Sequence, residues 1–329
     1  MEALFTVIAR SMGIEALQVE AVMTLLREGS SVPFIARYRK ERTKGLDEEQ
    51  IRQIEEAYQY QTHLEKRKED VLRLIDQQGM LDEALREAIC ACEKLSQVED
   101  LYRPYQQKRK TRATMAIAKG LRPLAEWMLR LPAKGDLRRE AAAFVGEQLK
   151  DETEAIAGAK DIIAEMVSDD ARVREVIRTS MQKYGRIVTK AKKQHTDERH
   201  IYQMYFDHSE RSDRVQPHRI MAIDRGEKEK VLQVSISFNE AYVEQWVLRR
   251  FLKNRATCVQ EELTAAIRDG LSRLAIPSVE REVRAALSER AQEASIDVFS
   301  MNVERLLTQP PIKDRWVLGF DPAFRTGCK

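Results

Sequence analysis

Seven basic side chains with no acid among them lie between residues 103 and 122, beside Tyr102 and Tyr105. They are Arg103, Lys108, Arg109, Lys110, Arg112, Lys119 and Arg122. Lysine and arginine neutralise phosphate groups, and aromatic rings stack on unpaired bases. The run predicts a nucleic-acid contact whose candidate residues are Arg103, Lys108, Arg109, Lys110 and Arg112. The alternative is a solvated loop after Pro104 whose charges pair with acids on neighbouring helices.

A second basic cluster lies on a short segment that we expect to be helical. Lys40, Arg42 and Lys44 surround a single acid, Glu41. The recognition helix of a helix-turn-helix unit presents such a basic face to a DNA groove. We therefore take Lys40, Arg42 and Lys44 as candidate nucleic-acid contacts, and whether they are free or paired stays open. We interpret the nearby Arg37 as a structural arginine, of the kind that pairs with a buried or interface carboxylate.

A third basic run precedes the string IYQMYFDHSE. It consists of Lys183, Arg186, Lys190, Lys192, Lys193 and Arg199, diluted only by Asp197 and Glu198. Such a run can line a phosphate path. Charge runs of this kind are more often mobile surface loops, which is the interpretation we prefer.

No pattern of metal ligands or nucleophiles is evident. His195, His200 and His208 have spacings that fit no zinc motif. Cys90 and Cys92 are two residues apart on a predicted helix, so they point about 200° apart and are expected to pack rather than to bind one ion. The sequence therefore predicts no metal and no cofactor.

The elements that carry these side chains are predicted to be almost entirely helical up to residue 185. From the N-cap residue Asp47 to Gly79 there is no Gly or Pro, and the apolar period predicts one long helix of ~45 Å. The other helices are expected at 2–11, 15–28, 33–45, 82–94, 97–103, 113–130, 136–149, 152–166, 169–183, 239–253, 257–274 and 278–297. Alternation predicts a strand at 231–238, whereas 184–200 has little periodicity.

Composition agrees with a helical protein of more than one core. The chain has 329 residues, 33% of them charged, with only 13 Gly and 9 Pro, which argues against an all-β fold. The net charge of +3 gives no information about a polyanionic partner. Four unevenly spread cysteines and no apolar stretch of membrane-spanning length predict a cytoplasmic protein that does not enter a membrane.

Four long strings together resemble a known family in order and spacing. They are SVPFIARYRKERTKGLDEEQI at 31–51, VEDLYRPYQQKRKTRATMAIAKGL at 98–121, HRIMAIDRGEKEKVLQVSI at 218–236 and QPPIKDRWVLGFDPAFRTGCK at 309–329. The sequence resembles the N-terminal part of the bacterial Tex family of transcription accessory proteins. That family usually has Gly-Gly where this chain has Lys44-Gly45, and Gly where it has Ala323.

The resemblance implies a mainly α, multi-helical fold with a long scaffold helix, a helix-turn-helix-like N-terminal unit, a small β element and the truncated start of an RNase H-like domain. We expect four parts. They are an N-terminal helical hairpin unit at 1–46, a long scaffold helix and helical region at 47–200, a second helical region with the β element at 201–311, and a linker with the first RNase H-like strand at 312–329. Family members continue with a helix-hairpin-helix module and an OB-type RNA-binding domain.

The resemblance also implies a function. We expect a nucleic-acid-binding scaffold that assists transcription, contacts RNA or DNA weakly and meets RNA polymerase or other transcription machinery. The alternative is a protein-interaction scaffold with no direct nucleic-acid contact. Asp321 corresponds to the first magnesium ligand of RNase H-like nucleases, but catalysis needs carboxylates from later strands. We therefore expect no catalytic residues and no enzymatic activity here.

Overall fold

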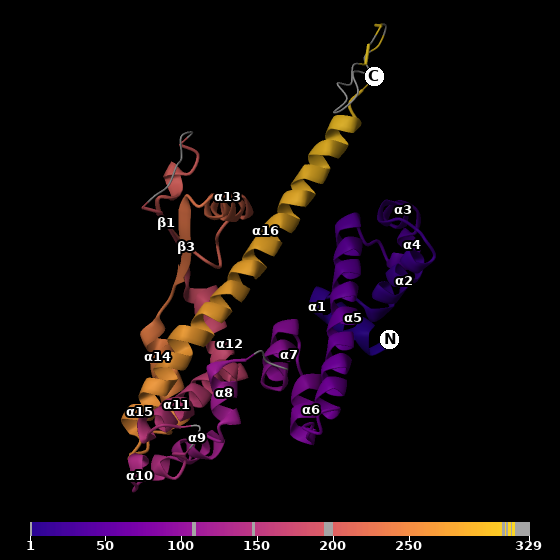
Figure 1. The fold of residues 1–329 in the computed structure, drawn as a ribbon. Coiled ribbons are helices and arrows are strands. Elements are labelled where there is room, and N and C mark those ends of the chain that lie inside the picture. The colour runs from indigo at the N-terminus through magenta and orange to yellow at the C-terminus, as the bar shows by residue number, and fades with distance from the viewer. Residues whose placement is uncertain are drawn as a thin grey trace. The chain divides into compact units, whose positions relative to one another are not determined.

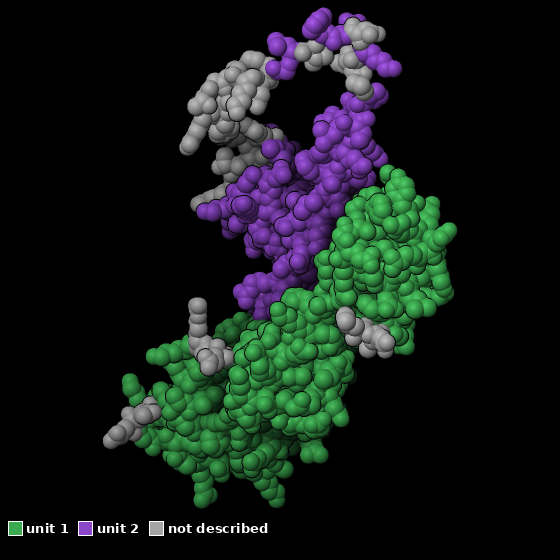
Figure 2. All heavy atoms as spheres, turned by 90° about the vertical axis from the view of Figure 1, so that its right-hand side faces the viewer, with its two compact units in different colours: residues 1–177, 242–276 green, residues 178–241, 277–329 purple. Residues whose placement is uncertain are grey.

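The computed structural model describes residues 2–106, 110–146, 149–193 and 200–310, and beyond them residues 313, 315, 316, 318 and 319. The chain forms two units, each assembled from two stretches of sequence. Residues 1–177 and 242–276 form unit 1, and residues 178–241 and 277–329 form unit 2 (Figure 2). Among the described residues helices predominate, and three strands form a sheet. The predicted mainly α fold with a small β element is therefore confirmed.

The N-terminal part of unit 1 is a group of short helices packed on one long helix. Its elements are α1 (Glu2–Met12), α2 (Ala16–Arg27), α3 (Val32–Tyr38), α4 (Lys40–Thr43) and α5 (Glu48–Asp76). Their common core contains Ile8, Val22, Ile35 and Ile54, all almost fully buried. The short helices expose one face and bury the other, so burial against α5 stabilises helices that are too short to persist alone.

The long helix α5 confirms the expected scaffold helix. A capping box fixes its start, because the Asp47 carboxylate accepts from the backbone N–H of Gln50 at 2.8 Å, and the Gln50 side chain accepts from the Asp47 N–H at 3.1 Å. The second half of α5 buries Leu64, Val71 and Ile75 against α6 (Glu83–Cys90) and α7 (Leu95–Tyr102).

The remaining helices of unit 1 surround α11. Its buried side chains, among them Ala155, Ala159 and Ile163, are small or β-branched and allow close approach of its neighbours. The elements here are η1 (Arg103–Tyr105), α8 (Arg112–Ala118), α9 (Arg122–Leu129), α10 (Leu137–Ala142), α11 (Glu152–Asp169), α12 (Ala171–Thr179), α14 (Glu240–Leu252), α15 (Gln260–Asp269) and the π-helical segment η4 (Gly270–Ala275). The single helix predicted at 113–130 is wrong, because Gly120 adopts φ +79° and Pro123 starts a new helix.

Unit 2 is built on the sheet. Its elements are the π-helical turn η2 (Ser180–Tyr184), β1 (Arg186–Ala191), η3 (Gln203–Tyr205), β2 (Asp207–Arg211), α13 (Pro217–Lys228), β3 (Leu232–Ser237) and α16 (Ile276–Leu307). The strand order is β2-β1-β3 and both pairings are antiparallel. The predicted strand at 231–238 is confirmed as β3.

The segment predicted to be an irregular basic loop contains the central strand β1. Ile187 and Thr189 are buried, Val188 between them is half-buried, and Arg186 and Lys190 on either side are exposed. This is the period-2 alternation of a half-buried strand. The pattern was hidden because basic residues occupy the outward positions.

One face of the sheet carries the core of unit 2. Ile187 and Leu232 pack with Ile220 and Ile223 of α13 and with Ala291 of α16, and Figure 1 shows α13 lying between β3 and α16. Within the described part of the chain, no helix is both long and apolar enough to cross a membrane. Most of the predicted RNase H-like start, including Asp321, lies outside the described residues.

Candidate nucleic-acid interface

The basic cluster of Lys40, Arg42 and Lys44 lies on the single-turn helix α4 and its C-cap. Arg39, at φ −126° and ψ 24°, separates α4 from α3, and Lys44 ends it in the left-handed conformation with φ +54°. A side chain in that conformation is strained, which accounts for the preference for glycine at such positions. Lys44 therefore adds a positive charge at a position better suited to Gly.

Two of the three α4 cations pair with the two ends of α2. Lys44 Nζ lies 2.5 Å from a carboxylate oxygen of Glu15, the N-cap residue, and Arg42 lies 3.8 Å from Glu28, the C-cap residue. All four side chains are at least half exposed, and such surface ion pairs contribute about 0–1 kcal/mol. Among the described residues no carboxylate lies within ion-pair distance of Lys40, which is exposed. The cluster can therefore exchange its weak partners for phosphates.

The arginines before α4 have local partners. Arg37 pairs with Glu48 at 3.7 Å, but both side chains are exposed, so this is a surface ion pair and not the expected pairing with a buried carboxylate. The Arg39 guanidinium lies 5.2 Å from the ring centre of Phe34, a cation–π contact.

Three residues of the basic run between 103 and 122 pair with acids of the protein. Arg103 pairs with Asp169 at 3.3 Å, and both side chains are largely shielded from water. Lys119 pairs with Glu154 at 2.7 Å, and this hydrogen bond is the main cause that lowers the Glu154 pKa. Arg122 pairs with Glu126 on the same helix. For Arg103 the shielded geometry favours the internal acid, whereas the Arg122–Glu126 pair is exposed and as weak as the pairs of α4.

The other members of this cluster divide into two groups. Lys108 and Arg109 lie outside the described residues. Lys110 and Arg112 are exposed. Arg112 begins α8 and lines a cleft of about 500 Å³ together with four carboxylates. Those carboxylates belong to Glu152, Asp161, Glu262 and Asp269. Lys110 therefore suits a phosphate better than Arg112 does.

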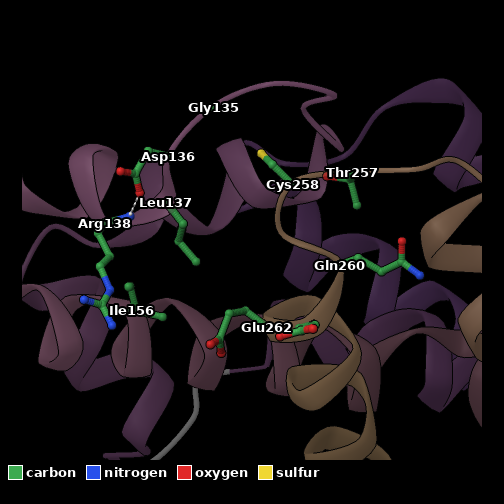
Figure 3. A pocket seen from close by; sticks show the side chains of 10 residues that line it. Gly135, Asp136, Leu137, Arg138, Ile156, Thr257, Cys258, Gln260 and Glu262 are labelled. Carbon is green, nitrogen blue, oxygen red and sulfur yellow. Dashed lines mark hydrogen bonds between the residues drawn. The ribbon is translucent and has the colours of Figure 1, made fainter.

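An adjoining cleft of about 610 Å³ shares Arg138, Ile156 and Glu262 with the first one. Figure 3 shows Asp136 and Arg138 on one side and Thr257 and Cys258 on the other. Thr257 Oγ1 donates to the carbonyl of Pro132 at 2.8 Å, which fixes one wall. Mixed charge makes this cleft a poor site for a polyanion.

No group of three or more potential metal ligands occurs among the residues that the structure describes. His195 lies outside them, His200 is exposed, and His208 lies 3.4 Å from Glu210. Cys92 is buried, as expected for a packing residue, and burial is the main cause that raises its pKa, whereas Cys90 is exposed.

Sequence reasoning gave too little weight to the third basic run. The structure places Arg186 and Lys190 on the exposed face of the central strand of the sheet. The signal that marks them is the alternation of buried Ile187 and Thr189 with these two cations.

The fold is that of a mainly helical protein with exposed cations on α4 and β1. Residues 2–76 match the family described as Tex-like protein N-terminal domain, and residues 133–299 match the family described as Tex central region-like. The chain therefore belongs to the Tex family, as the sequence resemblance indicated.

Individual relatives agree with this assignment. Uncharacterized protein YdcI of Bacillus subtilis is 47% identical over 98% of this chain and 45% of its own length. Transcriptional accessory protein Tex of Neisseria gonorrhoeae is 33% identical over 98% of this chain and 43% of its own length. S1 RNA-binding domain-containing protein 1 of Homo sapiens is 26% identical over 98% of this chain and 34% of its own length. The chain thus spans less than half the length of these relatives.

Proposed function

We propose that this chain is a nucleic-acid-binding scaffold that assists transcription. The observation that carries the proposal is the α4 cluster, where Lys40 has no carboxylate within ion-pair distance among the described residues and Arg42 and Lys44 have only exposed partners. Exposed, weakly paired cations lose little free energy when they exchange a carboxylate for a phosphate, and the release of counterions from the nucleic acid favours binding.

The relatives support the same role. One carries the name transcriptional accessory protein, and another is named for an S1 RNA-binding domain. The scaffold we propose holds nucleic acid against a helical body in the cytoplasm, where RNA polymerase or another part of the transcription machinery is its protein partner. The titration described next measures whether the chain prefers RNA or DNA.

The experiment compares two triple variants of the whole chain by fluorescence anisotropy with labelled single- and double-stranded RNA and DNA. One is Lys40→Gln/Arg42→Gln/Lys44→Gln. The matched control, Arg52→Gln/Lys66→Gln/Lys134→Gln, removes the same charge from exposed positions of unit 1 that have no ion pair among the described residues.

Loss of three phosphate contacts should make the salt dependence shallower by about 2 in the slope of log affinity against log salt, since each contact to a single strand contributes about 0.7. Affinity at low salt should fall about tenfold or more for the α4 variant and change little for the control. Equal losses in both variants would show that only total charge matters, and the α4 assignment would then be wrong.

We propose that the role is non-enzymatic. Labelled RNA and DNA incubated with the chain and magnesium should stay intact. Cleavage that disappears in the Asp321→Asn variant would overturn this part of the proposal and establish a nuclease instead.

A protein-docking scaffold is the second candidate, because the C-terminal part of α16 exposes apolar side chains. Ile296, Phe299, Leu306 and Leu307 are each at least 64% exposed. Docking through apolar surface is insensitive to salt between ~50 and 200 mM, whereas phosphate contacts weaken steeply over that range. The salt series therefore discriminates between the two functions.

A further inference from the structure

One face of the sheet in unit 2 is exposed. On β3 the residues Gln233, Ser235 and Ser237 are exposed, and they alternate with Leu232, Val234 and Ile236 on the core side. Antiparallel register places Val188 of β1 opposite Ser235, and opposite Ser209 of β2. Directly opposed residues share a face. The exposed face therefore consists of Asp207, Ser209 and Arg211 of β2, Arg186, Val188 and Lys190 of β1, and Gln233, Ser235 and Ser237 of β3.

The centre of this face is basic. Arg186 and Lys190 lie on the middle strand, four residues or about 13 Å apart along it. No acid occurs between Lys183 and Lys193. Both cations therefore point away from the core at the middle of the face.

Arg186 is held in place but not neutralised. Its Nε donates to the Ser209 hydroxyl at 2.8 Å, and a terminal nitrogen donates to the Ser209 carbonyl at 2.9 Å. Both acceptors are neutral, so the guanidinium keeps its full charge. A guanidinium has five N–H donors, and these two bonds leave three others for an incoming anion.

Lys190 is the second exposed cation of the middle strand. Its side chain is exposed, and no ion pair joins it to its register partner Asp207 or to another acid of the described residues. Arg211 differs, because Asp213 holds it at 2.7 Å and offsets its charge. The positive charge of the face is therefore concentrated at Arg186 and Lys190.

The neighbours of these cations suit a polynucleotide. Ser235, Ser237 and Gln233 supply hydroxyl and amide groups that can bond to sugars and base edges. Tyr184, the last residue of η2 and two positions before β1, is 74% exposed. Exposed aromatic rings are surfaces on which unpaired bases stack.

We propose that this exposed sheet face, centred on Arg186 and Lys190, binds a single-stranded nucleic acid through its phosphates. The inference rests on the proposed function and names a site for it in unit 2. Charge complementarity favours a polyanion, and the exposed Tyr184 favours a strand with unpaired bases over a duplex. An acidic protein segment could pair with the cations but has no bases to stack on Tyr184.

The test uses a matched pair of single variants in the whole chain. Lys190→Gln removes a charge from the exposed face. Lys228→Gln removes one from α13, which packs against the other face, at an exposed position without an ion pair among the described residues. A third variant, Ser235→Glu, places an acid at the centre of the exposed face. Circular dichroism and thermal melting check that all three fold.

Anisotropy titrations with single-stranded and duplex oligonucleotides measure the affinities over a range of salt. Lys190→Gln should reduce the slope of log affinity against log salt by about 0.7. Its loss of single-strand affinity relative to the unmodified chain should therefore be about fivefold larger at 0.1 M salt than at 1 M. Ser235→Glu should weaken it at least as much, and Lys228→Gln should leave it unchanged. The unmodified chain should bind a single strand more tightly than a duplex.

The possible failures are distinct. If the chain binds but Lys190→Gln and Lys228→Gln behave alike, the sheet-face site is wrong while the proposed function stands. If the duplex binds as tightly as the single strand, the single-strand assignment is wrong. If the unmodified chain binds no nucleic acid at low salt, the proposed function itself fails.

Discussion

Burial separates two roles of basic residues in this chain. Arg174 is fully buried, and its Nε lies 2.5 Å from a carboxylate oxygen of Asp100, which joins α12 to α7. Lys40 and Lys190 are exposed. A buried cation is held by its partner and cannot bind a ligand, whereas an exposed one can. The position of each basic residue, more than its type, therefore decides its role.

Residue type and spacing predicted where cations gather but not which of them are paired. The carboxylate that holds Arg103 belongs to Asp169, and the one that holds Lys119 belongs to Glu154. These partners are distant in sequence and become neighbours only through packing. Arg122 differs, because its partner Glu126 lies four residues away on the same helix.

Breaking the buried ion pair should strongly destabilise unit 1. Arg174→Met leaves the Asp100 carboxylate buried without its arginine, which should cost about 3–5 kcal/mol in the free energy of unfolding. Urea unfolding followed by circular dichroism measures this cost. Adding Asp100→Leu to the same variant should recover much of it, and a double variant less stable than the single one would contradict this explanation.

At the level of elements, local signals predicted most helices but not every boundary. The N-cap residue Asp47 marked the start of α5, whereas the break at Gly120 was missed because the apolar period continues across it. Strands β1 and β2 were missed because their exposed positions carry charged residues and their core-facing positions include the polar residues Thr189, His208 and Glu210. Such strands form through pairing with β3, which a local pattern does not reveal.

Close packing of η4 on α11 depends on Gly270. A Cβ atom at this position would lie 2.5 Å from the backbone carbonyl oxygen of Ala164. Gly270→Ala should therefore destabilise the chain by about 1–3 kcal/mol, because backbone atoms must move. Gly146→Ala is the control, since a Cβ there meets nothing within 4 Å. The urea midpoints measure both, and similar midpoints would refute the packing role of Gly270.

The ion pairs between η4 and its neighbours should make stability depend on pH. A hydrogen bond from Arg273 is the main cause that lowers the Asp269 pKa below its ordinary value of 3.8. A lowered pKa contributes stability that is present above the ordinary value and is lost as pH falls through the lowered one. The free energy of unfolding is measured from about pH 5 downward. Below pH 3.8 it should fall less steeply with pH in Arg273→Gln than in the unmodified chain. The exposed control Arg52→Gln should keep the original slope, and an unchanged slope in Arg273→Gln would contradict the assignment.

At the level of the whole molecule, each unit is assembled from two separate stretches of sequence. The four parts expected from the sequence, at 1–46, 47–200, 201–311 and 312–329, remain predictions. The discontinuity could not be read from composition, because α12, α14 and α16 all span unit boundaries without a linker or a change in residue type. Exposed cations occur in both units, on α4 in unit 1 and on β1 in unit 2.

The central claim is that this chain binds nucleic acid through exposed cations, and the salt dependence of its affinity tests that claim most directly. The unmodified chain is titrated against a single-stranded oligonucleotide at salt concentrations from ~50 to 200 mM. We predict a linear fall of log affinity with log salt, with a slope of about −2 or steeper, equivalent to three or more phosphate contacts. A slope near zero, or no binding at the lowest salt, would contradict the claim and favour a scaffold that docks proteins.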